Sequence, residues 1–367
     1  MNRFRSLFLL SIPVLAMGCV FLVYGLLSLL LFRDQLHIPF FELAAGTLLA
    51  GIAGLFGISR KLENISYRES LLFVTLTWSM LGALGGLPFV LINGLSFTDA
   101  TFEAISGLTT TGATTITGLD GLPKTLLMYR QFLHWMGGLG VIIFVVAIMP
   151  MLNIGGMRLY KAETPGPVKG EKLAPRISHT ARYLWYVYVA ITLACIAAYW
   201  LAGMNLYDAV AHAFATVSTG GFSTHDASIS YFNSPAIELV TIVFMLLGAM
   251  NFGLHFMVYN SRRLSLYWRD EETRWFFGIL LGAILLIALA LWWEGKFDAL
   301  TSLRHSAFQV ASFITSTGYF STDYTVWPGA VILLLIVLQY IGGCAGSTAG
   351  GNKVVRNAIT MKAIFLE

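Results

Sequence analysis

Long apolar stretches alternate with short polar ones along almost the whole chain. Mostly apolar runs cover residues 7–32, 40–58, 70–93, 125–151, 181–203, 235–259, 275–293 and 326–341, and the last continues in broken form to about 366. A helix of about 20 apolar residues crosses the roughly 30 Å hydrocarbon core of a membrane. The pattern therefore predicts an all-α integral membrane protein with several spans.

A short polar motif built on Thr-Gly occurs three times between these runs. The copies comprise Thr110, Thr111 and Gly112; Ser218, Thr219, Gly220 and Gly221; and Ser316, Thr317, Gly318 and Tyr319. When Gly112, Gly220 and Gly318 are aligned, hydroxyl residues return three positions later, at Thr115, Ser223 and Ser321. We interpret the three copies as equivalent parts of a repeated unit.

Each copy follows a predicted amphipathic helix that is too short to cross a membrane. These helices are expected over 99–109, 207–217 and 299–314, starting near Asp99, Asp208 and Asp298, since acidic residues favour helix N-termini. A helix that enters the membrane and stops inside it points its partly negative C-terminal end inward, which favours a cation. The pattern predicts re-entrant pore loops.

The composition of the motif indicates which oxygen atoms would bind a cation. Glycine allows the positive φ that non-helical backbone at membrane depth requires, and threonine and serine fit narrow spaces. The three stretches contain no carboxylate, so we expect backbone carbonyls to bind the ion, which suits potassium better than a divalent cation. Ordinary small-residue packing between helices is the alternative, and three copies in equivalent places favour the pore.

The repeats divide the chain into four parts. We predict an N-terminal transmembrane hairpin at 1–66, followed by pore repeats at 67–157, 178–262 and 273–367. The glycine-rich segment near the end of the third repeat interrupts its second apolar helix at Gly342, Gly343, Gly346, Ser347, Thr348, Gly350 and Gly351. This segment is predicted to be a gate below the filter, and a helix kink or a close packing contact is the alternative.

Composition and charge agree with a membrane protein. The chain is 57% hydrophobic and 11% charged, whereas soluble domains carry about 25% charged residues. Most Lys and Arg residues fall in the N-terminus and in 59–69, 154–182, 261–274 and 353–367, which the positive-inside rule makes cytoplasmic. This predicts a multi-pass protein with a cytoplasmic N-terminus and filters that open to the outside.

Other kinds of chemistry find little support in the sequence. The three cysteines and the scattered histidines have no metal-ligand spacing, and no catalytic constellation is visible. Asn352 separates Gly351 from Lys353, so the glycine-rich segment does not match a phosphate-binding loop. We expect neither an enzyme nor a nucleic-acid-binding protein, and no tightly bound organic cofactor.

These residues closely resemble the Trk/Ktr/HKT superfamily of potassium transporters, and its TrkH type in particular. The resemblance covers essentially the whole chain and includes the N-terminal hairpin, the three Thr-Gly motifs and the Gly-Ser-Thr-Ala-Gly-Gly segment at 346–351. It implies four pseudo-symmetric repeats around one pathway. By this resemblance, potassium is the substrate and 342–351 is the gating loop. The potassium filter would be lined by Thr111, Gly112, Thr219, Gly220, Thr317 and Gly318.

The resemblance also implies partners and a location. Members work as homodimers in the bacterial inner membrane, in contact with lipid, gated by a cytoplasmic nucleotide-binding ring protein called TrkA. Asn352 stands where the family usually has an apolar residue. The family's fourth repeat would follow residue 367, so we expect three of four repeats and a truncated transporter, whether a fragment or an interrupted gene product.

Three functions stay open from the sequence. The first is potassium uptake through a channel-like pore, with any coupling to protons or sodium, as in a symporter, undecided. The second is a truncated, non-conducting membrane subunit. The third is a sodium-permeable relative, which a serine at the first filter glycine would favour, but that position is Gly112.

Overall fold

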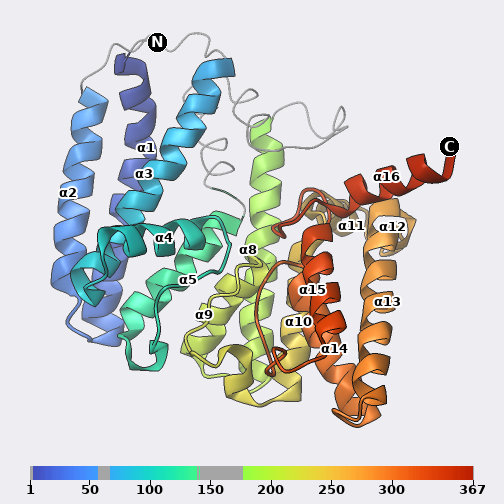
Figure 1. Ribbon diagram of the computed structural model, residues 1–367. Coiled ribbons are helices and arrows are strands. Elements are labelled where there is room, and N and C mark those ends of the chain that lie inside the picture. The colour runs from blue at the N-terminus through green and yellow to red at the C-terminus, as the bar shows by residue number, and fades with distance from the viewer. Residues whose placement is uncertain (1–2, 57–66, 139, 141–176, 367) are drawn as a thin grey trace. The chain divides into compact units, whose positions relative to one another are not determined.

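The computed structural model describes residues 3–56, 67–138, 140 and 177–366, and every regular element in them is helical (Figure 1). The N-terminal part contains α1 (Arg3–Leu27), the π-helical turn η1 (Ser28–Phe32), α2 (His37–Phe56), α3 (Tyr67–Asn93), α4 (Phe97–Leu108), η2 (Leu119–Gly121) and α5 (Lys124–Gly138). The remainder contains α8 (Ile177–Leu201), α9 (Leu206–Val217), η4 (Ser228–Phe232), α10 (Pro235–Ala249), α11 (Phe252–Ser261), α12 (Ser265–Arg269), α13 (Glu271–Trp293), α14 (Ala299–Ile314), α15 (Gly329–Ile341) and α16 (Val354–Leu366).

Several of these helices are long and apolar enough to cross a membrane. Five qualify singly within the described residues, at 10–32, 37–55, 72–93, 183–201 and 271–293, and α10 with α11 adds a sixth if that bent pair is one span. Large apolar side chains such as Leu30, Leu201 and Trp293 are exposed on them, as expected of surfaces that face lipid. The prediction of an all-α membrane protein is confirmed. The predicted span at 125–151 lies partly outside the described residues.

The chain divides into two compact units. The first contains α1 to α5, and the second contains α9 to α16 with most of α8, and also includes Thr110–Gly112. In the first unit, the ring of Tyr129 is fully buried against Phe21, Tyr24 and Phe40, and its hydroxyl donates to the Gly85 carbonyl at 2.8 Å. This aromatic cluster fixes α5 against the N-terminal hairpin and α3.

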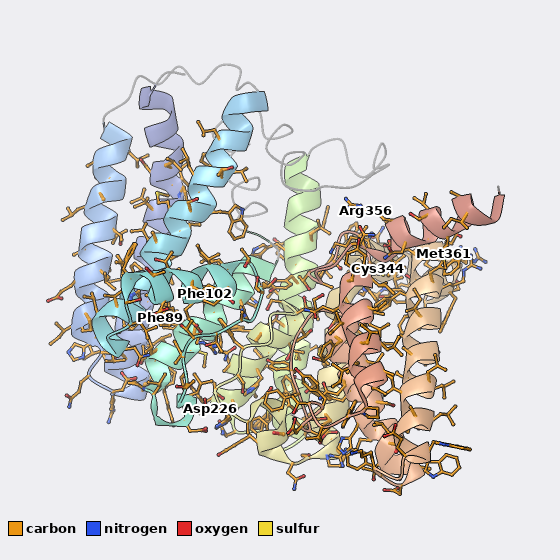
Figure 2. The ribbon with its side chains drawn as sticks, in the orientation of Figure 1. Phe89, Phe102, Asp226, Cys344, Arg356 and Met361 are labelled. Carbon is orange, nitrogen blue, oxygen red and sulfur yellow. The ribbon has the colours of Figure 1, made fainter. Side chains whose placement is uncertain are left out.

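The second unit has the glycine-rich segment at one end and the loop that follows the second Thr-Gly motif at the other. Figure 2 shows Cys344 and Arg356 at the end opposite to Asp226, which follows the second Thr-Gly motif. The predicted gate and the mouth of the predicted filter are therefore separated along the length of this unit.

The three short helices before the Thr-Gly motifs are present. With 12, 12 and 16 residues, α4, α9 and α14 extend about 18 to 24 Å at about 1.5 Å per residue, which is too short to span a membrane. Each of the three repeats has the same order: a long helix, a short helix, an extended stretch and another helix. The predicted boundaries at residues 66 and 157 lie outside the described residues.

Two of the three helices begin slightly earlier than predicted, α4 at Phe97 and α9 at Leu206, because the expected acidic residue is not the N-cap. The N-cap residues are Ser96 and Asn205, whose side chains accept hydrogen bonds from the backbone N–H groups of Asp99 and Asp208. Only Asp298 is itself the N-cap. Serine and asparagine cap as well as aspartate does, and the acidic residue three positions later then lies in the first turn, where it still favours the helix dipole.

The predicted span at 235–259 is not one continuous helix. It is broken into α10 and α11, which meet at an angle of 96°. Met250 is extended, and the side chain of Asn251 caps α11 by accepting from Gly253 N at 2.8 Å. The last carbonyls of α10 are satisfied from elsewhere, because Cys344 N donates to Ala249 O at 2.9 Å. The break depends on a partner about a hundred residues away, which the local apolar pattern does not reveal.

Candidate functional site

Two of the short helices, α9 and α14, end in the same backbone motif. At the end of α9, Thr219 N donates to Thr216 O at 3.0 Å and Gly220 N donates to Ala215 O at 2.8 Å. At the end of α14, Ser316 N donates to Phe313 O at 2.9 Å and Thr317 N donates to Ser312 O at 2.8 Å. These pairs are the two bonds of a Schellman motif, which turns the chain sharply out of a helix.

A left-handed residue follows each short helix. Thr110, Thr219 and Ser316 have φ values of 54°, 53° and 56°. Glycine usually occupies this place, because a side chain there costs roughly 1–2 kcal/mol. The polar stretch of each repeat therefore begins at a defined backbone turn.

The helix ends correct the alignment of the second repeat. Two residues after each left-handed residue comes a glycine with positive φ, at Gly112 (77°), Gly221 (83°) and Gly318 (82°). Gly221, not Gly220, is therefore equivalent to Gly112 and Gly318, and Thr224 replaces Ser223 as the equivalent of Thr115 and Ser321. The alignment on the first glycine of the Gly220-Gly221 pair failed because the helix end sets the register.

The three polar segments meet inside the second unit. A Cβ added to Gly112 would overlap the carbonyl oxygen of Gly220, and one added to Gly221 would overlap that of Thr317. A Cβ added to Gly318 would meet nothing within 4 Å among the described residues. Gly112 thus lies against Gly220 of the second segment, and Gly221 lies against Thr317 of the third segment.

The carbonyl directly after each glycine is held by a hydroxyl group. Ser106 Oγ donates to Ala113 O at 2.6 Å, and Ser312 Oγ donates to Tyr319 O at 2.6 Å. In the second repeat the equivalent helix position is Ala215, and there the hydroxyl of Tyr319 donates to Phe222 O at 3.0 Å. The fully buried Tyr319 side chain therefore supplies from the third repeat the bond that the second repeat lacks.

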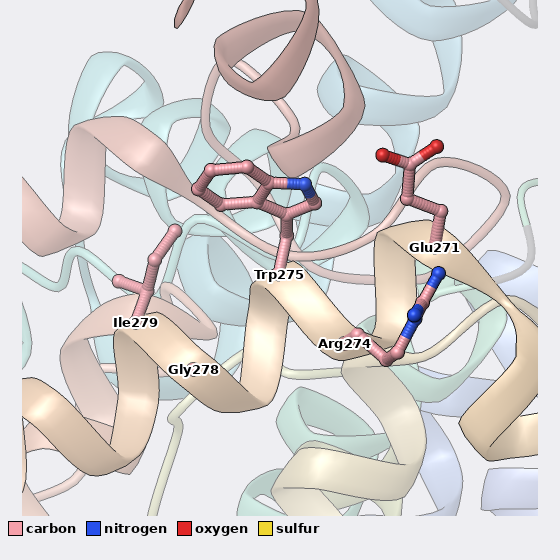
Figure 3. Close-up of a pocket in the computed structure, with 5 residues that line it drawn as sticks. All are labelled: Glu271, Arg274, Trp275, Gly278 and Ile279. Atoms are coloured by element: carbon pink, nitrogen blue, oxygen red, sulfur yellow. The ribbon is translucent and has the colours of Figure 1, made fainter. Parts of the chain in front are cut away.

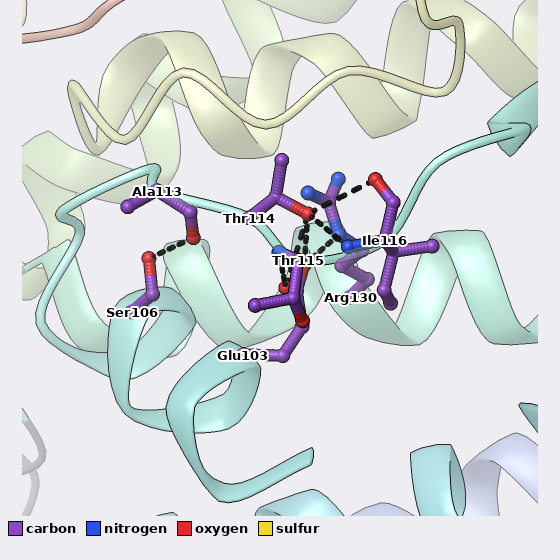
Figure 4. Close-up of polar contacts among 7 residues, drawn as sticks. All are labelled: Glu103, Ser106, Ala113, Thr114, Thr115, Ile116 and Arg130. Atoms are coloured by element: carbon purple, nitrogen blue, oxygen red, sulfur yellow. Dashed lines mark hydrogen bonds and ion pairs between the residues drawn. The ribbon is translucent and has the colours of Figure 1, made fainter. Parts of the chain in front are cut away.

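A second polar tie links each short helix to the stretch beyond the glycine. It starts from Glu103, His212 and Gln309, which occupy the same helix position in the corrected register. Glu103 accepts from Thr115 N at 3.0 Å, the His212 ring bonds Ser223 Oγ at 2.9 Å, and Gln309 Nε2 donates to Thr322 O at 3.3 Å. Figure 4 shows the first of these ties, with the Glu103 carboxylate beside Thr114 and Thr115. The unaligned sequence concealed this equivalence, because the three residue types differ.

The glycine-rich segment is a loop between α15 and α16 and not a kink in one helix. Gly342, Gly346 and Gly351 have positive φ values of 77°, 69° and 80°. A Cβ at Gly342 would overlap the Gly350 carbonyl, so the two ends of the loop lie against each other. The loop is compact and closely packed.

The loop contacts the second and third polar segments. Thr348 Oγ1 lies 3.0 Å from the carbonyl of Val217 and 2.9 Å from that of Gly248. A Cβ at Gly350 would lie 3.2 Å from Ser316 Oγ. Gly343 lies against Ala249 at the end of α10. Ser347 Oγ donates to Cys344 O within the loop. The predicted gate and the predicted filter are therefore in direct contact.

The Glu272 carboxylate at the start of α13 binds both the loop and the first turn of α16. Glu272 Oε1 accepts from Ala345 N at 2.7 Å and from Val355 N at 3.1 Å. The Lys353 ammonium donates to the Ala349 carbonyl. Sequence reasoning missed Glu272, because it precedes the loop by about seventy residues.

A surface hollow lies away from these segments. It has a volume of about 500 Å³ and is lined by Glu271, Arg274, Trp275, Gly278 and Ile279, all on α13 (Figure 3). Because its lining comes from one face of one helix and includes none of the Thr-Gly or loop residues, it is not part of the site described above.

Comparison with known proteins agrees with the fold. A family model described as "TrkH: Cation transport protein" matches residues 44–367. The chain belongs to the TrkH family of cation transport proteins. The Trk system potassium uptake protein TrkH of Halomonas elongata is 49% identical over 302 residues, which cover 82% of this chain and 63% of that protein.

Members of the TrkH family with longer chains match over most of this sequence. The Trk system potassium uptake protein TrkH of Vibrio parahaemolyticus is 45% identical over 362 residues, covering 96% of this chain and 74% of that protein. The crystal structure of the potassium transporter TrkH from Vibrio parahaemolyticus covers all of this chain and 76% of its own, with a TM-score of 0.88 and 40% identity. The chain thus spans under two thirds of its Halomonas relative, at 63%.

Proposed function

We propose that the chain takes part in potassium uptake across the bacterial inner membrane through a channel-like pore. The observation that carries the proposal is the meeting of the segments around Gly112, Gly221 and Thr317, where each glycine lies against a carbonyl of the next segment. Similar proteins named potassium uptake protein TrkH support potassium as the substrate.

Backbone carbonyls around these glycines replace the water shell of the ion in this proposal. The left-handed turns and positive-φ glycines hold extended backbone that a helix does not offer, and the hydroxyl bonds at Ala113, Phe222 and Tyr319 engage the next carbonyl along each segment. The ligands are then the carbonyls at and before the glycines, in the segments Thr110–Gly112, Thr219–Gly221 and Ser316–Gly318. The C-terminal ends of α4, α9 and α14 add partial negative charge that favours a cation.

The loop that includes Gly342–Gly351 closes the pathway in this proposal. Its contacts with Val217 and Gly248 place Thr348 against the end of α9, where an ion leaving the filter would pass. Opening then requires these bonds to break. The proposed orientation has a cytoplasmic N-terminus, with this loop on the cytoplasmic side of the filter.

The proposed assembly is a homodimer regulated by a cytoplasmic nucleotide-binding subunit of the TrkA type. A fourth polar segment, expected from the family resemblance, would face Gly318, whose added Cβ meets nothing within 4 Å among the described residues. The same observation favours the second candidate, a membrane subunit that does not conduct alone. The glycine at position 112 argues against the sodium-permeable candidate.

Rubidium uptake tests the proposal in cells that lack their own potassium uptake systems. The chain is expressed alone and, in parallel, joined to the C-terminal part of a longer TrkH relative. Saturable rubidium uptake that potassium inhibits more strongly than sodium is expected from at least the joined form. Uptake only by the joined form selects the non-conducting subunit, whereas no uptake by either form, with both present in the membrane, contradicts the proposed function.

A further inference from the structure

Glu103 and Arg130 form a buried ion pair behind the first polar segment. Arg130 Nε donates to Glu103 Oε1 at 2.6 Å, and the exposed fractions of the two residues are 1% and 0%. Glu103 belongs to the short helix α4 and Arg130 to α5. Charges this deeply buried are costly unless they are paired and hydrogen-bonded, so the pair requires its further contacts.

Those further contacts are made to the chain just beyond Gly112. Thr114 Oγ1 donates to the carboxylate, at 2.9 and 3.0 Å from its two oxygens, and Thr115 N donates to Oε2 at 3.0 Å (Figure 4). Thr114 Oγ1 in turn accepts from Ile116 N at 3.0 Å. One carboxylate thus fixes the side chain of Thr114 and the backbone of Thr115.

Ser106 completes the attachment of this segment to α4. Its hydroxyl holds the Ala113 carbonyl at 2.6 Å, one residue after Gly112. Residues 113 to 115 are therefore fastened to α4 at consecutive positions. This anchor restricts the orientation of the peptide groups at Thr111 and Gly112, because two soft dihedral angles separate the Gly112 carbonyl from the anchored Ala113 carbonyl and four separate the Thr111 carbonyl from it.

The equivalent positions in the other repeats use neutral groups. His212 Nδ1 lies 2.9 Å from the Asp208 carbonyl, which can only accept, so in a neutral ring Nδ1 donates and Nε2 accepts from Ser223 Oγ at 2.9 Å. Gln309 bonds Thr322 O at 3.3 Å. Of the three equivalent ties, the one at Glu103 is the ionic one, and its carboxylate binds both a hydroxyl group and a backbone N–H group.

We propose that Glu103, held in place by Arg130, is a positioning residue that sets the geometry of the first filter segment and thereby its preference for potassium over sodium. The proposal rests on the proposed function and adds a specificity determinant outside the Thr-Gly motif. A cage of backbone carbonyls distinguishes ions of different size only while its oxygens keep their spacing. The Glu103 carboxylate maintains that spacing in the first segment by accepting from Thr114 and Thr115.

A matched control exists in the second unit. Arg304 and Glu238 form an ion pair of the same chemistry, with bonds of 2.7 and 2.6 Å, and Glu238 is 3% exposed. Within the described residues, the contacts of this pair join α14 to α10 and include no residue of a polar segment. Glu238→Gln therefore breaks a partly buried ion pair without releasing a filter segment.

The test measures ion preference in the variants Glu103→Gln and Glu238→Gln and in the charge-exchanged double variant Glu103→Arg/Arg130→Glu. Two readouts are used: the potassium-to-sodium inhibition ratio of rubidium uptake in the joined form, and the concentrations of potassium and sodium that raise the melting temperature of the purified chain. The second readout needs no conduction. Glu103→Gln is expected to reduce the potassium preference about tenfold, and Glu238→Gln is expected to leave it unchanged.

The double variant separates positioning from simple structural support. It restores an ion pair, but a guanidinium has no acceptor for Thr115 N–H or Thr114 O–H, so the potassium preference stays reduced if the proposal is right. Restored preference in the double variant, or unchanged preference in Glu103→Gln, overturns it. If the double variant does not fold, Glu103→Gln against Glu238→Gln decides alone. A wild-type chain without any potassium preference overturns the proposed function and this inference with it.

Discussion

The hydroxyl of Thr348 lies 3.0 Å from the carbonyl oxygen of Val217, the last residue of α9. The two residues are 131 positions apart, and the contact joins the glycine-rich loop directly to the start of the second polar segment. Thr348 N also donates to Gly248 O at 3.1 Å, so the loop binds both α9 and the end of α10. The second polar segment and the glycine-rich loop are thus neighbours without an intervening element.

Replacing Thr348 by valine is expected to loosen the loop and increase the rate of rubidium uptake by the joined form. Valine has nearly the same shape but cannot donate to Val217 or Gly248, so the closed arrangement loses about 1 kcal/mol, which corresponds to a several-fold rise in the open fraction. Initial uptake rates at matched expression measure the effect.

Two variants control this experiment. Thr348→Ser keeps the hydroxyl and should behave as wild type. Ser347→Ala removes a bond that stays inside the loop, to Cys344 O, and should change the rate less than Thr348→Val. A lower or unchanged rate in Thr348→Val would show that this contact does not hold the pathway closed.

Gly221 is expected to tolerate substitution less well than Gly318. Both have positive φ, so alanine costs roughly 1 kcal/mol of backbone strain at either position. Only at Gly221 would the new Cβ also overlap the Thr317 carbonyl. Gly221→Ala should abolish uptake by the joined form and clearly lower the melting temperature of the purified chain. Gly318→Ala should lower that melting temperature only slightly.

The measurement for this pair is thermal unfolding of the purified chain, together with uptake by the joined form. Gly278→Ala serves as the control, because an added Cβ there meets nothing within 4 Å and the residue lies in the middle of α13. Equal destabilisation by Gly221→Ala and Gly318→Ala would argue against the close approach of the second and third segments.

The sequence predicted the architecture because its signals are local. Apolar length, the short helices and the repeated Thr-Gly motif follow from nearby residues, and they gave five of the predicted spans, α4, α9 and α14 to within a few residues, whereas the run predicted at 326–341 forms only the 13-residue helix α15. The alignment of the second repeat with the other two was wrong for a local reason as well. Gly220 and Gly221 are adjacent, and only the end of α9 at Val217 decides which of them is equivalent to Gly112 and Gly318.

Long-range contacts were beyond the sequence pattern. The break between α10 and α11 depends on bonds from the glycine-rich loop, and the role of Tyr319 depends on the absence of a hydroxyl at Ala215 in a different repeat. The pairing of Glu103 with Arg130 likewise joins two helices whose side chains give no hint of each other in the unaligned chain.

Tyr319→Phe is expected to destabilise the protein through a single lost hydroxyl. The Phe222 carbonyl loses its 3.0 Å bond while staying buried, which costs roughly 1–3 kcal/mol in the free energy of unfolding and lowers the melting temperature by a few degrees. Tyr340→Phe is the control, because Tyr340 is 69% exposed. Equal melting temperatures for the two variants would mean that the Tyr319 bond contributes nothing to stability.

Asp208 should make stability depend on pH in the acidic range. Burial by itself would raise the pKa of Asp208, but hydrogen bonds from His225 and Thr224 and the other polar neighbours outweigh it and lower this pKa from 3.8 to about 2. Because the folded-state pKa lies below the unfolded one, the stabilisation is fully present above about pH 4 and is lost as the pH falls toward 2.

The comparison of Asp208→Asn with wild type isolates this effect. The variant should have a lower melting temperature at pH 7, and the difference between the two proteins should shrink as the pH falls from about 4 to about 2. A difference that stays constant across this range would indicate that Asp208 contributes through its shape and its cap contacts alone.

The most direct test of the central claim is to locate the ion itself. Anomalous X-ray diffraction from crystals of the protein grown with rubidium or thallium in place of potassium shows where a potassium-like cation binds. The account predicts an anomalous peak among the carbonyl oxygens of Thr111, Gly220 and Thr317, which is displaced by excess potassium and not by sodium. A well-ordered second unit without a peak at that position would contradict the assignment of these segments as a potassium filter.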